Sequence, residues 1–108
     1  MDRQQDQADV VYPHDIVGQS QAMLQAAQAG NWEDVDGLER QRHASIQKLF
    51  AQNPLDAAPD DIIVAIQHIQ DIDKEIAALA IAEKKSVLEQ LKAFKNSRQA
   101  HKAYLQHR

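Results

Sequence analysis

The feature that most constrains this chain is a long run of apolar residues at helical spacing in its second half. From residue 62 to residue 94, the positions of a strict 4-3 heptad are apolar at seven of ten places. A second apolar series runs beside the first and widens the apolar surface of the same helix. Its members are Ile63, Ile72, Leu79, Ile81, Leu88 and Leu91. A helix with this much apolar circumference must contact more than one neighbour, so the chain is expected to form a helical bundle.

The composition favours an all-α fold. Only three glycines and three prolines occur in 108 residues, too few for the frequent turns of an all-β domain. A chain of this length buries one core and no more. Cysteine is absent, which excludes disulfides, thiolate metal sites and cysteine nucleophiles. We therefore expect one small all-α domain whose stability comes from packing.

The limits of the helices follow from residues that end or begin them. Residues 1–10 are polar and without periodicity, which predicts a disordered tail before a single domain over 11–108. Gly30-Asn31 and Asn53-Pro54 separate the first three helices. Asn96-Ser97 leaves open whether the last segment is a short fourth helix or a helical extension. The sequence predicts a small antiparallel bundle of three long helices plus this segment, with helices over about 12–29, 31–52, 60–95 and 97–106.

Two charged residues of opposite sign interrupt the apolar stripes of neighbouring helices. Arg42 belongs to the second helix and Asp73 to the third. With the loop between these helices centred near residue 56, Asp73 lies within about one turn of Arg42, and Glu39 lies one turn from Arg42 on its own helix. The spacing predicts a structural ion pair of Arg42 with Asp73, with Glu39 beside it, that fixes the helix register rather than performing catalysis.

The residue patterns of catalysis and metal binding do not occur in this sequence. The five histidines, at 14, 43, 68, 101 and 107, include no pair at i and i+4 with a glutamate between them, as a zinc helix needs. There is no glycine-rich phosphate loop and no GxSxG nucleophile motif. An enzyme of the small all-helical chorismate mutase type would need several interior cations, and only Arg42 is expected inside. We expect no catalytic residue, no metal and no cofactor.

Charge is divided between the two halves of the chain. Residues 1–61 carry a net charge of −7 and residues 62–108 a net charge of +3. No base-stacking aromatic residues alternate with the lysines of the second half, so nucleic-acid binding is not expected. No apolar run approaches the roughly 18 residues that span a bilayer, and the N-terminus has no basic and apolar signal region. These features predict a cytoplasmic protein without membrane insertion.

The apolar surface of the long helix is larger than simple packing between two neighbours requires. Apolar stripes at helical spacing are usually core. The excess also fits a partner-binding groove, a helical adaptor, or a homo-oligomeric coiled-coil module that pairs through the 62–94 heptad. The residue pattern leaves these alternatives open.

Several short motifs follow one another along the chain in a definite order. They are SQAML at 20–24, WEDV at 32–35 with Glu39 and Arg42 after it, IQDIDKEI at 69–76, the run from Leu88 to Leu91, and Ala103-Tyr104. In this order and spacing, they resemble the FliT-type flagellar type III export chaperones of bacteria. The resemblance covers about residues 12–105.

The resemblance implies a cytosolic chaperone for a flagellar export substrate. Such a chaperone would hold the C-terminal helical region of the filament-cap protein before secretion and hand it to components of the export ATPase complex. Some family members also bind the flagellar master transcription regulator, which adds this regulator to the candidate partners.

The resemblance also implies a groove and a C-terminal segment that gates it. The gating segment would carry Phe94, Tyr104 and Leu105. A docked segment competes with the partner, so deleting residues 97–108 is expected to tighten partner binding. The groove is expected to be lined by Ile66, Ile69, Ile76, Leu79, Ala80, Val87 and Leu91.

Overall fold

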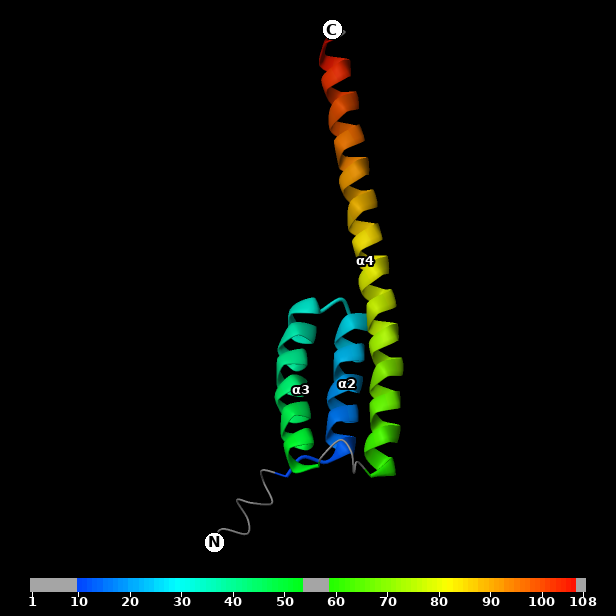
Figure 1. Cartoon of the computed structure of the whole chain (residues 1–108). Coiled ribbons are helices and arrows are strands. Elements are labelled where there is room, and N and C mark those ends of the chain that lie inside the picture. The colour runs from blue at the N-terminus through cyan, green and yellow to red at the C-terminus, as the bar shows by residue number, and fades with distance from the viewer. Residues whose placement is uncertain (1–9, 54–58, 107–108) are drawn as a thin grey trace. The chain divides into compact units, whose positions relative to one another are not determined.

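A computed structural model describes residues 10–53 and 59–106, which form three helices and no strand (Figure 1). The helices are α2 (Pro13–Gln28), α3 (Trp32–Gln52) and α4 (Asp60–Gln106). The predicted all-α class is confirmed, and the limits expected for the first two helices agree with the structure to one residue. The predicted tail over 1–10 lies outside the described residues except for Val10, which is exposed.

Local chemistry explains where α2 begins and where it turns into α3. Tyr12 is extended, Pro13 opens α2, and the Asp15 carboxylate accepts a hydrogen bond from the Tyr12 amide at 3.0 Å. Gly30, at φ 78°, has the left-handed conformation that lets the chain reverse tightly. Asn31 occupies the cap position of α3, but its side chain makes no capping hydrogen bond. The helix hairpin therefore depends on the glycine turn more than on the asparagine cap.

The helix expected over 60–95 and the segment expected over 97–106 form one helix. α4 runs through Asn96 and Ser97 without a break, so a separate short fourth helix is not found and the last segment is a helical extension. The physical reason is that Asn and Ser cost a helix interior only about 0.5 kcal/mol relative to Ala, far less than Gly or Pro. No glycine or proline follows Pro59.

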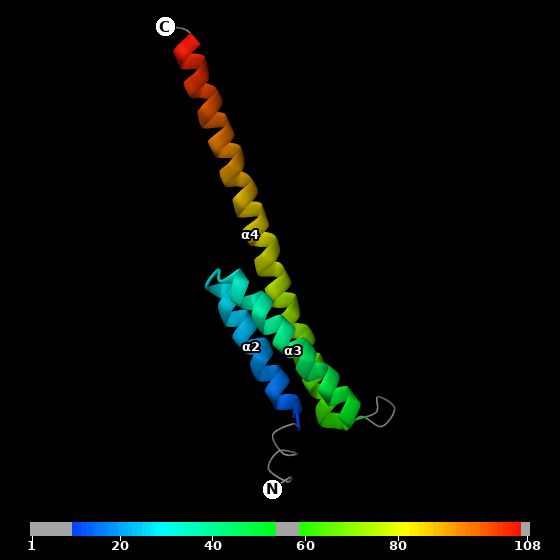
Figure 2. The same cartoon turned by 90° about the vertical axis from the view of Figure 1, so that its left-hand side faces the viewer.

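The structure divides into two units, one up to Ala77 and one from Ala78. In the first, α2 and α3 lie side by side and antiparallel, and the first part of α4 runs alongside them (Figures 1 and 2). Each helix contributes one residue to the centre of the core: Ile16, Leu49 and Ile62. Partly buried side chains pack around these three, namely Val11, Ile46, Phe50, Ile66 and Ile69. The three helices of this unit therefore share one core.

The second unit contains one described element, the part of α4 from Ala78 to Gln106. Its residues are mostly Ala, Leu, Lys, Glu and Gln, which lose little side-chain entropy in a helix. The buried apolar residues of the described chain all come at or before Ile72. Within the described ranges, no helix has both the length and the apolarity that crossing a bilayer requires.

Candidate partner-binding surface

The second unit exposes large apolar side chains to solvent. Ile81 is 70% exposed, Phe94 67% and Tyr104 66%, and Val87, Leu88, Leu91 and Leu105 are between 42% and 59% exposed. Single exposed apolar residues are normal on a protein surface, whereas a run of seven on one helix segment indicates an interaction site. This segment is therefore the candidate functional site.

Four of these residues share one side of α4. They are separated by four, three and eleven residues, in the order Val87, Leu91, Phe94 and Leu105. Because an α-helix has 3.6 residues per turn, these separations are close to one, one and three full turns. We call these four residues the apolar strip. Two of the four, Val87 and Phe94, are also positions of the 4-3 heptad that begins at Ile62. The strip offers a partner helix the i, i+4, i+7 pattern on which helix pairing depends.

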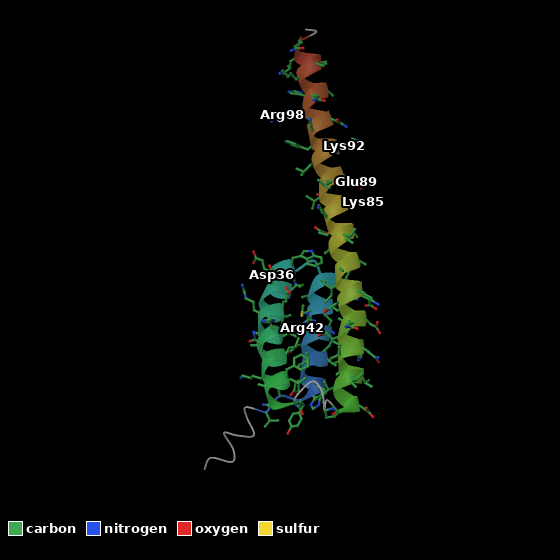
Figure 3. All side chains as sticks on the ribbon, viewed as in Figure 1. Asp36, Arg42, Lys85, Glu89, Lys92 and Arg98 are labelled. Carbon is green, nitrogen blue, oxygen red and sulfur yellow. The ribbon has the colours of Figure 1, made fainter. Side chains whose placement is uncertain are left out.

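Cations outnumber anions on this segment. Residues 78–106 contain six lysines and arginines against two glutamates. Lys84, Lys95 and Lys102 each lie three or four residues from a member of the apolar strip, so they border it. Lys85 and Lys92 lie with Glu89 along one side of α4, and Arg98 lies on the other (Figure 3). The segment therefore combines an apolar strip with positive charge.

The structure separates the seven residues predicted to line a groove. Ile66 and Ile69 pack against the core of the first unit, and they line a pocket of about 160 Å³ with Ile16, Leu49 and Phe50. The other five lie further along α4, where Ile76 and Leu79 are half-buried and Ala80, Val87 and Leu91 are exposed. A continuous groove through all seven residues stays a prediction.

The three residues predicted to form a gating segment belong to α4 itself. Phe94, Tyr104 and Leu105 are exposed members of the continuous helix. Gating requires a segment that docks and leaves as a separate piece. The gating role stays a prediction. Because the helix is unbroken, these residues are also candidates for direct contact with a partner.

The structure brings Arg42 and Asp73 together in the first unit. Arg42 Nη1 donates to Asp73 Oδ1 at 2.7 Å, and the Arg42 side chain is only 11% exposed. Glu39 is exposed, and none of the ion pairs among the described residues includes it. The predicted neighbour Glu39 therefore lies beside this pair without joining it.

Ser20 is a partner of Arg42 that the sequence did not reveal. Its hydroxyl is fully buried, donates to the Ile16 carbonyl at 3.0 Å, and accepts from Arg42 Nη1 at 3.1 Å. One guanidinium thus links α2, α3 and α4 through two side chains. The available signal was the position of a serine in the middle of the apolar stripe of α2, between Ile16 and Met23.

Among the described residues, no cluster of three or more His, Cys, Asp or Glu side chains could hold a metal ion. What the exposed surface of α4 provides is apolar contact area and positive charge. These are the components of reversible protein binding.

Comparison with known proteins places the chain in a family. The family model described as "Flagellar protein FliT" matches residues 14–106, which includes α3 and α4 in full and all but the first residue of α2. No curated protein and no solved structure gives a match. The match covers most of the sequence, and the chain therefore belongs to the FliT family of flagellar proteins.

Proposed function

We propose that this protein is a cytoplasmic flagellar export chaperone that shields the C-terminal helical region of the filament-cap protein. It then delivers this substrate to components of the export ATPase complex. Membership of the FliT family supports a flagellar export chaperone in general. The choice of the filament-cap protein as substrate follows from the family resemblance of the sequence.

One observation carries the proposal, namely the exposed apolar side chains of α4 between Ile81 and Leu105. An export substrate with an amphipathic helical end exposes an apolar face until it assembles, and such a face promotes aggregation. A chaperone helix with a matching apolar side covers that face reversibly. The apolar strip supplies this side without loss of core, because the buried residues of the bundle lie elsewhere in the sequence.

Phe94, Tyr104 and Leu105 take part in this binding in our proposal. Their side chains are exposed on a helix that continues without interruption to Gln106. A partner helix that follows the strip gains contact area at each of them. Gating by residues 97–108 is the competing proposal, and the two differ in the expected effect of deleting those residues.

A flagellar transcription regulator is the second proposed partner. A regulator that docks through an apolar helical face would use the same side chains of α4 as the export substrate. Binding of the two would then be mutually exclusive. Competition between them in one titration tests this part of the proposal.

The direct test is a titration of the full chain with the C-terminal segment of the filament-cap protein from the same organism. Isothermal calorimetry should show saturable one-to-one binding. Leu91→Asp places a charge in the apolar strip and should weaken binding about 10- to 100-fold. Lys92→Asp is the matched control, because it introduces the same side chain one residue away, outside the strip, and should leave affinity within about 2-fold.

Absence of binding, or equal losses in both variants, would contradict the proposed function. A homo-oligomeric coiled-coil module is the alternative, favoured by the exposed heptad positions Val87 and Phe94. Light scattering over a range of concentrations distinguishes it. A molar mass that rises with concentration, together with no binding of the filament-cap segment, would favour the coiled-coil module.

A further inference from the structure

Between Phe94 and Leu105 of the apolar strip, the same side of α4 carries a charged residue, Arg98. Arg98 follows Phe94 by four residues and precedes Leu105 by seven, so it lies on the same side of the helix as the strip. Figure 3 shows it on the other side of α4 from Lys85, Glu89 and Lys92. A purely apolar partner would bury the guanidinium without an acceptor, which lowers affinity. Arg98 therefore favours a partner that places a carboxylate opposite it.

Three lysines continue this charge along one border of the strip. Lys84 precedes Val87 by three residues, Lys95 follows Leu91 by four, and Lys102 precedes Leu105 by three. We call these three residues the lysine border. Glu83, four residues before Val87, is the acidic residue next to the strip, and Glu89 lies on the side away from Arg98. A partner helix on the strip would meet mostly positive charge.

The first unit already contains an arginine within an apolar helix face that pairs with a carboxylate from a facing helix. Arg42 interrupts the apolar stripe of α3, as Arg98 interrupts the apolar strip of α4. Arg42 is accommodated because the facing helix supplies Asp73 at 2.7 Å. An arginine within an apolar helix face thus already pairs with a carboxylate from a facing helix in this protein.

We propose that the apolar strip, Arg98 and the lysine border together bind an acidic amphipathic helix. Its apolar side covers the strip, one carboxylate pairs with Arg98, and further carboxylates face the lysine border. The inference rests on the proposed function and specifies that the bound segment carries negative charge. It concerns selectivity, since an apolar surface alone would accept amphipathic helices of either charge.

The test uses three designed helical peptides and the full chain. The peptides share one leucine stripe and differ only at the positions that flank it, which are all Glu, all Gln or all Lys. Fluorescence anisotropy should show the Glu peptide binding about 10-fold tighter than the Gln peptide, with the Lys peptide weakest. Raising the salt concentration from about 0.05 M to about 0.5 M should reduce this difference. Equal affinities for the three peptides would overturn the inference.

Two variants that each remove one positive charge test whether the selectivity for the Glu peptide depends on Arg98. Arg98→Gln should weaken binding of the Glu peptide about 10-fold, because the carboxylate loses its partner. Lys92→Gln removes one charge from the other side of the same helix and should change the affinity less than about 2-fold. Both variants should keep the helical circular dichroism of the parent. Equal weakening by both would mean that only net charge matters, which would overturn the inference.

The same variants, titrated with the filament-cap segment, separate this inference from the proposed function. If the Glu peptide binds as expected and the filament-cap segment does not, the inference holds and the proposed substrate is wrong. If the filament-cap segment binds and Arg98→Gln leaves that binding unchanged, the proposed function holds and the inference is wrong.

Discussion

Arg42 of α3 and Asp73 of α4 meet at 2.7 Å in a partly buried ion pair that joins two helices that follow each other along the chain. The arginine side chain is almost covered, whereas the carboxylate keeps 43% of its surface exposed. Water therefore still solvates the anion, and the desolvation cost of the pair is smaller than in a dry interior. We expect the pair to fix the register of α3 against α4, because a shift of one turn would leave the guanidinium buried without its acceptor.

Replacing this arginine should destabilise the bundle. Arg42→Ala removes the ion pair and leaves the buried Ser20 hydroxyl with one hydrogen-bond partner fewer. We expect the free energy of unfolding to fall by about 1–3 kcal/mol, measured by urea denaturation followed by circular dichroism. Arg40→Ala is the control: Arg40 is exposed, and its loss should cost no more than about 0.5 kcal/mol. An Arg42→Ala variant as stable as the parent would show that the pair is energetically neutral.

A double-mutant cycle isolates the pair itself. Combining Arg42→Ala with Asp73→Ala should reveal a coupling free energy of about 1 kcal/mol, since one partner is still partly solvated. The cycle uses the same urea denaturation. Strict additivity of the two single variants would mean that the cost of Arg42→Ala comes from lost packing and from Ser20 instead.

Ser20 should tolerate only a residue of its own size. The side chain is fully buried, so Ser20→Leu would force extra volume between α2 and its neighbours and should cost about 1–3 kcal/mol or more. Ser20→Ala loses two hydrogen bonds but keeps the volume, and should cost about 1 kcal/mol. Ser86→Ala on the exposed part of α4 is the control and should be neutral. Equal stability of the Ser20→Leu variant and the parent would contradict tight packing at this position.

Two isoleucines at opposite extremes of exposure test where the core ends. Ile16 is 1% exposed and Ile81 is 70% exposed. Ile16→Ala should lower the free energy of unfolding by about 2–5 kcal/mol, because it removes buried methyl groups and leaves a cavity. Ile81→Ala should change it by less than about 0.5 kcal/mol. A large loss at Ile81 would show that this side chain is covered in solution, for example by a second copy of the chain.

The parts of the fold predictable from sequence are those that depend on local residues. Gly30 fixes the turn between α2 and α3 because only glycine adopts its positive φ without strain. The short connection before α4 fixes the register closely enough to place Asp73 within a turn of Arg42. By contrast, the continuation of α4 through Asn96-Ser97 could not be decided, since the helix penalty of these residues is smaller than the effects of context.

The surface could be predicted less well than the fold. A 4-3 heptad is the same pattern whether a neighbour covers it or not, so the sequence does not separate the heptad positions Ile66 and Ile69 from the heptad positions Val87 and Phe94. In the structure the first two pack against the core and the last two are exposed. The role of Ser20 could not be predicted, because the sequence does not distinguish a helical serine that bonds only to its own backbone from one that also accepts from a facing arginine.

Truncation separates the two roles considered for the end of α4. Deleting residues 97–108 removes Arg98, Tyr104 and Leu105 and no residue of the first unit. If these residues bind the partner, the truncated chain should hold the filament-cap segment at least about 10-fold more weakly, because it loses apolar contact area and the guanidinium. If they gate the surface, the truncated chain should bind more tightly, since the competing state is gone. Calorimetric titration of the full and truncated chains with the same segment decides between them, and unfolding of both chains in urea verifies that the bundle itself is unchanged. We expect weaker binding, because α4 carries these side chains on a continuous helix in which they are exposed.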